Sequence, residues 1–208
     1  MENEKVLILG DSIARHYFPY LESKLLEKEI EAVIPEKFVS CQWKQQRYID
    51  GAFVMKRCYN GRKLKAKTVH FNFGLHSIKL PSKGHDPDVQ RAPEKSFEIY
   101  EEELIKHIEV LRSYGRHVLF SNTTPNPKNA GMRKDEDVVI LNEIAKRVME
   151  KYDVPHNDLY GFVKAQEDYP RLYLHPRAEN NCHFDELGRK LLGENIANFI
   201  LENFVGNE

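Results

Sequence analysis

The chain has 208 residues, of which 41% are hydrophobic and 30% are charged. This balance is typical of a soluble globular protein and excludes an intrinsically disordered chain. Lys and Arg total 31 against 32 Asp and Glu, so no net charge favours nucleic acid or an acidic membrane surface.

The N-terminus and the cysteines indicate the compartment. Residues 1–5 lead directly into an apolar strand, without the basic region, apolar stretch and small-residue cleavage site of a secretory signal. No apolar run approaches the roughly 20 residues of a membrane span. The three cysteines are odd in number and widely spaced, which is typical of a reduced compartment: Cys41, Cys58 and Cys182. We therefore expect a cytoplasmic protein with one domain over residues 1–208 and no membrane span.

Strands and helices are predicted to alternate along the first third of the chain. Residues 6–9 are a continuous apolar run, as in a strand buried on both faces. Residues 17–29 predict a helix, because four apolar side chains recur at helical spacing: Tyr17, Leu21, Leu25 and Leu26. A strand weakened by Pro35 is expected within residues 30–39, and helical content within residues 43–59.

The middle of the chain predicts two more strands with a helix between them. Residues 68–73 are rich in β-branched and aromatic side chains, and Gly74 ends this strand. Residues 81–93 contain three prolines and predict an exposed loop. Residues 94–114 predict an amphipathic helix ended by Gly115, with four apolar side chains in register: Ile99, Leu104, Ile108 and Leu111. Residues 117–120 predict the fourth strand.

The last third of the chain predicts two helices around a short strand. Residues 135–152 place Ile140, Ile144 and Val148 on one face of a helix, and residues 154–160 predict a fifth strand. Asp185 is the expected N-cap of the final helix, whose apolar residues are Leu191, Leu192, Ile196 and Ile200. This alternation predicts an α/β fold, with a parallel sheet between two layers of helices.

Polar segments follow three of the predicted strands, where an open parallel sheet binds its ligands. These segments are residues 10–12, 74–77 and 121–124, and residues 180–183 lie directly before the final helix. Nine histidines include no pair with the spacing of a metal site, so we expect no metal. Cys182 beside His183 suggests thiol chemistry, but a buried structural cysteine is the commoner case.

Ser12 and His183 are the candidate nucleophile and base. Ser12 lies where a strand turns into a helix, so its hydroxyl is accessible and its amide is at a helix N-terminus that favours negative charge. The alternative is a simple N-cap by Asp11 or Ser12. A lone histidine is more often structural than catalytic, but the chain returns to this edge of the sheet at His183. A serine and a histidine that meet there form a nucleophile and its base.

These segments, in this order, resemble the sequence blocks of the SGNH (GDSL-type) hydrolases. The resemblance spans nearly the whole chain and rests on Gly10-Asp11-Ser12, Gly74-Leu75-His76, Thr123-Thr124-Pro125, Asn157-Asp158-Leu159-Tyr160, and His183-Phe184 with Gly188 and Leu191-Leu192. It implies a three-layer α/β/α sandwich with a flavodoxin-like, five-stranded parallel sheet. It also implies a Ser-His-Asp ester hydrolase that needs no cofactor and binds the oxyanion with the nucleophile's amide, a Gly amide and an Asn side chain.

The sequence departs from the family pattern in three blocks. The third block usually reads Gly-x-Asn-Asp, and here His76 stands in place of the oxyanion asparagine. A neutral imidazole donates one N–H, so His76 is assigned that role, with a packed loop histidine as the alternative. The second-block glycine has no clear equivalent, and Ser40-Cys41 and Gly51 are the candidates for its place. Gly74, Asp11, Cys41 and Thr123 complete the predicted oxyanion and substrate-binding set.

Asn180 stands where the family has an aspartate three residues before the catalytic histidine. Loss of this carboxylate removes the group that fixes the tautomer of the imidazole, and in a serine protease it lowers turnover by about 10⁴. Asn180 is the third predicted catalytic position, and the resemblance to SGNH-type enzymes implies that a Ser-His dyad can work when a backbone carbonyl orients the ring. Glu179 or a more distant acid is the alternative, whereas Asp185 is better explained as a helix cap.

The resemblance implies a serine esterase that hydrolyses a small acyl ester. O-acetyl groups on a carbohydrate are the favoured substrate, because relatives with a Gly-Leu-His block include carbohydrate O-acetylesterases. The expected partners are small-molecule or glycan esters and not nucleic acid, and the loops at 81–93 and 125–134 are expected to shape the entrance. The alternatives are a catalytically weak or inactive binding module, and a thioesterase or lysophospholipase.

Overall fold

The computed structural model describes residues 4–34, 66–75, 77–78, 93–126, 133–174 and 182–206. Its centre is a five-stranded sheet in the order β2-β1-β3-β4-β5, in which every pair of neighbours is parallel. The strands are β1 (Glu4–Gly10), β2 (Ile30–Val33), β3 (Thr68–Asn72), β4 (His117–Ser121) and β5 (His156–Asn157). This order is that of flavodoxin-like sheets, which confirms the predicted fold class.

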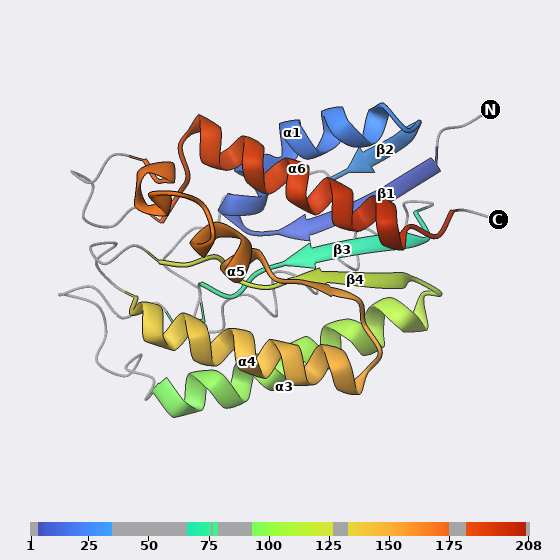
Figure 1. The fold of residues 1–208 in the computed structure, drawn as a ribbon. Helices are drawn as coiled ribbons and strands as arrows, with labels where there is room; N and C mark the ends of the chain where they lie inside the picture. The colour runs from blue at the N-terminus through green and yellow to red at the C-terminus, as the bar shows by residue number, and fades with distance from the viewer. Residues whose placement is uncertain are drawn as a thin grey trace, which may run out of the picture.

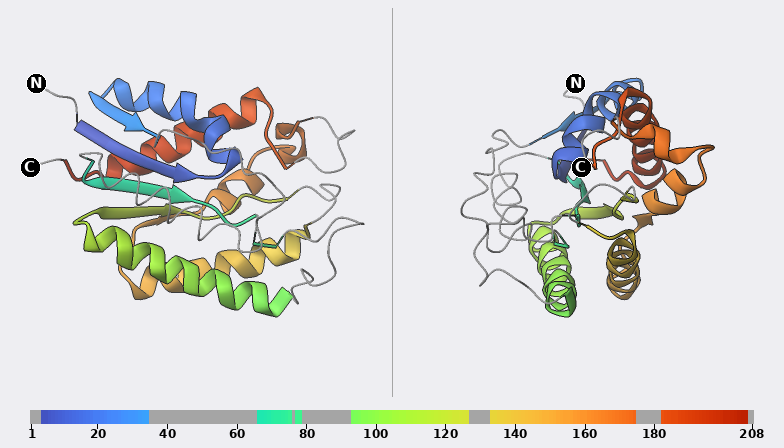
Figure 2. Two further views of the ribbon diagram at one scale, coloured as in Figure 1. Left: turned by 180° about the vertical axis from the view of Figure 1, so that it is seen from behind. Right: turned by 90° about the vertical axis from the view of Figure 1, so that its left-hand side faces the viewer.

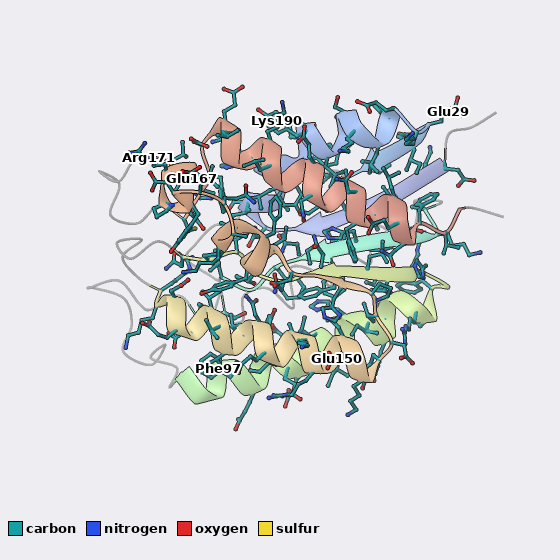
Figure 3. All side chains as sticks on the ribbon, viewed as in Figure 1. Glu29, Phe97, Glu150, Glu167, Arg171 and Lys190 are labelled. Carbon is teal, nitrogen blue, oxygen red and sulfur yellow. The ribbon has the colours of Figure 1, made fainter. Side chains whose placement is uncertain are left out.

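Helices cover both faces of the sheet (Figure 1 and Figure 2). One layer contains α1 (Ser12–Leu26) and α6 (Glu186–Asn203), and the other contains α3 (Pro93–Ser113) and α4 (Asp135–Lys151). Side chains alternate along β3 between the two layers: the ring of His70 contacts Phe199 on α6, whereas that of Phe71 contacts His107 on α3. Lys190 on α6 and Glu150 on α4 point outward on opposite sides of the molecule (Figure 3).

The predicted apolar faces of the helices are confirmed with three exceptions. On α3, Ile99 is only partly buried, and its neighbour Tyr100 is the residue that points into the core. In α1, Tyr17, Leu21 and Leu25 are fully buried, but Leu26 is 48% exposed. Leu26 directly follows the last buried position, and one residue turns the side chain by about 100° around the helix. Ile140 on α4 is 39% exposed for the same reason, because its neighbour Leu141 is the residue that points into the core.

The predicted fifth strand is too long. β5 ends at Asn157, and Asp158 then accepts a hydrogen bond from the amide of Gly161 at 2.9 Å. This bond caps a short helix, α5 (Leu159–Lys164), so Leu159 and Tyr160 are helical. A short 3-10 turn, η2 (Tyr169–Leu172), follows α5 and was not predicted either.

The predicted helix ends at Asp185 and Gly115 are confirmed by their hydrogen bonds, whereas the helix predicted over residues 17–29 both begins and ends earlier, at Ser12 and Leu26. Asp185 accepts from the amide of Gly188 at 2.8 Å and caps α6. Gly115 has a φ of +70°, and the following Arg116 amide donates to Leu111 O at 3.1 Å. The second predicted strand ends at Val33 within the described residues. The predicted helical segment 43–59 and most of the two expected entrance loops lie outside the described residues.

The strand register brings the predicted blocks to one edge of the sheet. Gly10 pairs with Asn72, and Phe71 pairs with Phe120. Both β1 and β3 end at the Gly10–Asn72 pair, so Ser12 and Gly74 each lie two residues beyond the same edge of the sheet. The carboxyl ends of β1 and β3 point the same way (Figure 1), so the edge next to α1 is where a ligand site is expected.

Candidate active site

Ser12 and His183 meet at this edge although they are 171 residues apart in the sequence. The Ser12 Oγ and the His183 Nε2 are 2.8 Å apart, which is hydrogen-bonding distance. Ser12 is the first residue of α1, and Asp11 is its N-cap, because Asp11 Oδ1 accepts from the Ile13 amide at 2.8 Å. Asp11 thus caps the helix and the Ser12 hydroxyl faces the imidazole.

The segment that carries His183 is fixed on both sides by backbone hydrogen bonds. Leu174 N donates to His183 O at 2.9 Å, and Asp185 N donates to Leu172 O at 2.8 Å. Between these bonds the ring of Phe184 is buried against Tyr173, with ring centroids 4.2 Å apart. The imidazole therefore projects from a segment that is paired antiparallel with residues 172–174, and this pairing restricts the backbone of His183.

His16 lies one helical turn after Ser12 and packs against His183. The ring centroids of His16 and His183 are 4.8 Å apart, with planes inclined by 46°. Burial lowers the pKa of His16, and the nearby His183, Arg189 and Arg15 lower it further, while Asp11 opposes them. These surroundings favour the neutral form of the His16 imidazole. Sequence reasoning missed this residue, although its i, i+4 relation to Ser12 was a usable signal.

A small pocket lies next to the two residues that flank Ser12 in the sequence. Its volume is about 10 Å³, which is room for about one water molecule, and it is lined by Asp11, Ile13, Asn72, Phe73, Gly74, Leu75, Thr123 and Thr124. Gly74 is required by the close approach of β4, because a Cβ at this position would lie 2.1 Å from Thr123 Oγ1. The Asn72 side-chain amide donates to Ser121 O and Asn122 O, each at 2.9 Å, and so ties β3 to β4 below the pocket.

The two threonines of the pocket have different surroundings. Thr123 Oγ1 donates to Phe73 O at 3.3 Å, and Thr123 N donates to Asn142 Oδ1 at 2.9 Å. Thr124 is 2% exposed, and its Oγ1 has no hydrogen-bond partner in the part of the chain that the structure describes. The sequence predicted Thr123 as a site residue. No feature of the sequence distinguishes Thr123 from its neighbour Thr124.

The remaining predicted site residues are not placed. His76, Asn180 and Cys41 lie outside the described residues. Cys182 is buried. Within the described ranges, no group of three His, Cys, Asp or Glu side chains is arranged to hold a metal ion. Among the described helices, none is long and apolar enough to cross a membrane.

Solved structures share this fold from end to end. A lipase/acylhydrolase from Enterococcus faecalis matches with a TM-score of 0.65 over 98% of this chain and 98% of its own, at 15% identity. A GDSL-like lipase from Bacteroides thetaiotaomicron matches with a TM-score of 0.63 over 95% and 88% of the two chains, at 12% identity. An acetyl xylan esterase matches with a TM-score of 0.55 over 97% and 100%, at 16% identity.

The likeness is one of structure, since no protein-family model and no curated protein matches the sequence. It covers nearly all of this chain and of each similar structure. The resemblance drawn from the sequence is thereby confirmed at the level of the fold: this chain has the fold of the GDSL-type lipases and acylhydrolases.

Proposed function

We propose that the protein is a serine carboxylic ester hydrolase, with Ser12 as nucleophile and His183 as general base. The observation that carries this proposal is the 2.8 Å contact between Ser12 Oγ and His183 Nε2. A serine becomes a nucleophile when a base accepts its proton at hydrogen-bonding distance. The fold shared with acylhydrolases and esterases supports the same reaction class.

The first half of the reaction forms an acyl-enzyme. Ser12 Oγ attacks the ester carbonyl carbon while its proton passes to His183 Nε2, and a tetrahedral oxyanion forms. The Ser12 amide at the N-terminus of α1 stabilises this oxyanion, with Gly74 and the His76 side chain as the further proposed donors. The intermediate then collapses: the bond from carbon to the alcohol oxygen breaks, and the alcohol leaves with the proton from His183.

The second half releases the acid. Water loses a proton to His183 Nε2 and attacks the acyl carbonyl, forming a second tetrahedral oxyanion. Its collapse breaks the bond to Ser12 Oγ, and Ser12 regains the proton from His183. The products are a carboxylic acid and the free enzyme. The residues that carry the chemistry are Ser12 and His183, and Asn180 is proposed to help orient the imidazole.

A short acyl group is proposed for the substrate. The described pocket between the ends of β1, β3 and β4, which Phe73, Leu75 and Thr124 help to line, is too small for a long acyl chain. An acetyl group is the favoured acyl group, and a carbohydrate hydroxyl is the favoured alcohol. The structural likeness to an acetyl xylan esterase supports this choice. A long-chain thioester or lysophospholipid would need a longer apolar trench.

The test is hydrolysis of p-nitrophenyl acetate, butyrate and octanoate, together with labelling by a fluorophosphonate. Wild type, Ser12→Ala and His183→Ala are compared with Ser113→Ala, which removes a hydroxyl bonded to Val110 O at the end of α3. We expect labelling and turnover to disappear in Ser12→Ala and to persist in Ser113→Ala. Acetate should be the preferred ester, and acetylated xylan the natural-type substrate to try next.

The alternatives give different results in the same assay. Preference for octanoate over acetate would contradict the short acyl group and favour a lipid or thioester substrate. Equal labelling of wild type and Ser12→Ala, with no turnover by either, would contradict the esterase and favour a role in binding acylated glycans.

A further inference from the structure

We infer that His16 is a positioning residue for His183: its ring packs on the imidazole of His183 and holds it against Ser12. This inference rests on the proposed esterase function and adds a residue to it. The observations that support it are the position of His16 on α1, its ring contact with His183 and its burial.

The geometry links three side chains through one helix. Ser12 and His16 are four residues apart on α1 and therefore lie on the same face. His183 meets both residues: its Nε2 is 2.8 Å from Ser12 Oγ, and its ring centroid is 4.8 Å from that of His16. A ring that contacts both residues cannot rotate away from Ser12 without losing its packing on His16.

The surroundings of His16 favour its neutral form. The charged and titratable groups around it are His183, Arg189 on α6, and Arg15 and Asp11 at the start of α1. His16 is partly buried, and its Nδ1 is enclosed with no hydrogen-bond partner among the described residues. Burial and three basic neighbours lower its pKa, and Asp11 alone opposes them.

A neutral ring is what the reaction requires at this position. His183 becomes a cation each time it accepts the Ser12 proton, and the face of a neutral aromatic ring favours a cation next to it. A protonated His16 would instead repel the His183 cation. The SGNH pattern places an aspartate three residues before the histidine, where this sequence has Asn180. His16 thus supplies part of the orientation that a carboxylate would otherwise provide.

Three substitutions separate the contributions of ring and charge. His16→Ala removes the ring, His16→Phe keeps a neutral ring, and His16→Lys places a cation beside His183. His156→Ala is the matched control, because it removes a histidine on β5, which is three strands away from β1. Each variant is measured by kcat and KM for p-nitrophenyl acetate against pH, and by ¹⁵N NMR of the His183 imidazole, assigned with His183→Gln.

The expected pattern has four parts. His16→Ala lowers kcat about 10- to 100-fold with little change in KM, as expected when a reacting group is misplaced. In the same variant the NMR spectrum shows His183 shifting from one tautomer to a mixture. His16→Phe restores the single tautomer and most of kcat. His16→Lys lowers the pKa of His183, and the acid limb of kcat/KM moves to lower pH.

Two results would overturn the inference. The first is a His16→Ala variant with wild-type kcat and an unchanged His183 tautomer. The second is a His16→Phe variant that fails as fully as His16→Ala while both remain folded. The NMR measurement does not depend on turnover, so it tests the positioning role even if the wild type proves inactive. If the wild type is inactive but His16→Ala still changes the His183 tautomer, the esterase function is contradicted and the positioning role of His16 is not.

Discussion

Asp11 and Ser12 are neighbours with separate tasks. The Asp11 carboxylate accepts a hydrogen bond from the Ile13 amide and so caps the N-terminus of α1, while the Ser12 hydroxyl contacts His183. The sequence offered helix capping and nucleophilic attack as competing interpretations of this segment. Both fit the structure because they fall on different residues, and capping by Asp11 fixes the helix start that presents Ser12.

Thr123 and Thr124 form a matched pair for a test at the residue scale. Thr123→Val removes the hydroxyl that donates to Phe73 O, so we expect the free energy of unfolding to fall by about 1 kcal/mol. Thr124→Val removes a buried hydroxyl with no partner among the described residues, so the free energy of unfolding should stay equal or rise by about 1 kcal/mol. Urea unfolding measures both.

The activity of the same pair tests the role of the pocket. Because Thr124 lines the pocket, we expect Thr124→Val to lower kcat/KM for the acetyl ester even though it does not destabilise the fold. Such opposed effects on stability and activity are typical of residues kept for function. A Thr124→Val variant that loses stability would show that this hydroxyl serves the fold. A variant that keeps full activity would show that the hydroxyl contacts no ligand.

The contact between α1 and α6 couples two elements of the site. Ser12 and His16 lie on α1, and His183 lies three residues before α6. The two helices cross at Gly193, where a Cβ would be 2.7 Å from Tyr17 O and 2.9 Å from Leu21 N. Both of these are backbone atoms, so a side chain at this position must push the helices apart.

Gly193→Ala is therefore the test at the element scale. Overpacking of this kind costs about 1–3 kcal/mol, and we expect a loss of stability in that range. The displacement should also slow fluorophosphonate labelling of Ser12, because His183 moves with α6. Glu194→Ala, at the next position on α6, should leave both properties near wild type. A stable Gly193→Ala variant with normal labelling would contradict the close crossing.

At the scale of the whole molecule, a buried polar network lies between the sheet and α6. His70 Nε2 and Ser121 Oγ are 2.7 Å apart, and both residues are fully buried. The Asn157 side-chain amide contacts Ser121 Oγ at 3.4 Å and donates to Asn195 Oδ1 on α6 at 2.7 Å. The network joins β3, β4, β5 and α6 across the centre of the fold. Its inaccessible Ser-His pair is structural.

This network predicts how stability depends on pH. Burial lowers the pKa of His70 from 6.5 to about 3, so between these values the unfolded chain binds a proton that the folded chain does not. His70 therefore contributes its full stability above pH 6.5 and loses it as the pH falls towards 3. At pH 5 the loss attributable to His70 is about 2 kcal/mol.

Urea unfolding of wild type and His70→Gln at pH 7.5 and pH 5 measures this term. His70→Gln is less stable at pH 7.5, because it disturbs the network, but it lacks the titrating group. Wild type should lose about 2 kcal/mol more than the variant between the two pH values. An equal loss in both proteins would show that His70 is protonated in the folded state at pH 5.

Local patterns in the sequence determined the elements of this protein and the order of its blocks. The apolar run before Gly10, the helical spacing of Tyr17, Leu21 and Leu25, and the cap at Asp185 each depend on neighbours within a few residues, and each is confirmed. The predicted strand at 154–160 contains β5 but was too long, because Leu159 and Tyr160 fit a strand or a short helix equally well. The hydrogen bond of Asp158 to Gly161 decided the outcome.

The tertiary structure alone decided which side chains meet. The 2.8 Å contact of Ser12 with His183 needs the parallel register of the sheet, the Tyr173–Phe184 bridge and the close crossing at Gly193 together. The packing of His16 on His183 and the difference between Thr123 and Thr124 likewise depend on residues far away in the sequence. Periodicity reports which face of an element is buried, but not what lies against that face, because distant segments supply those contacts.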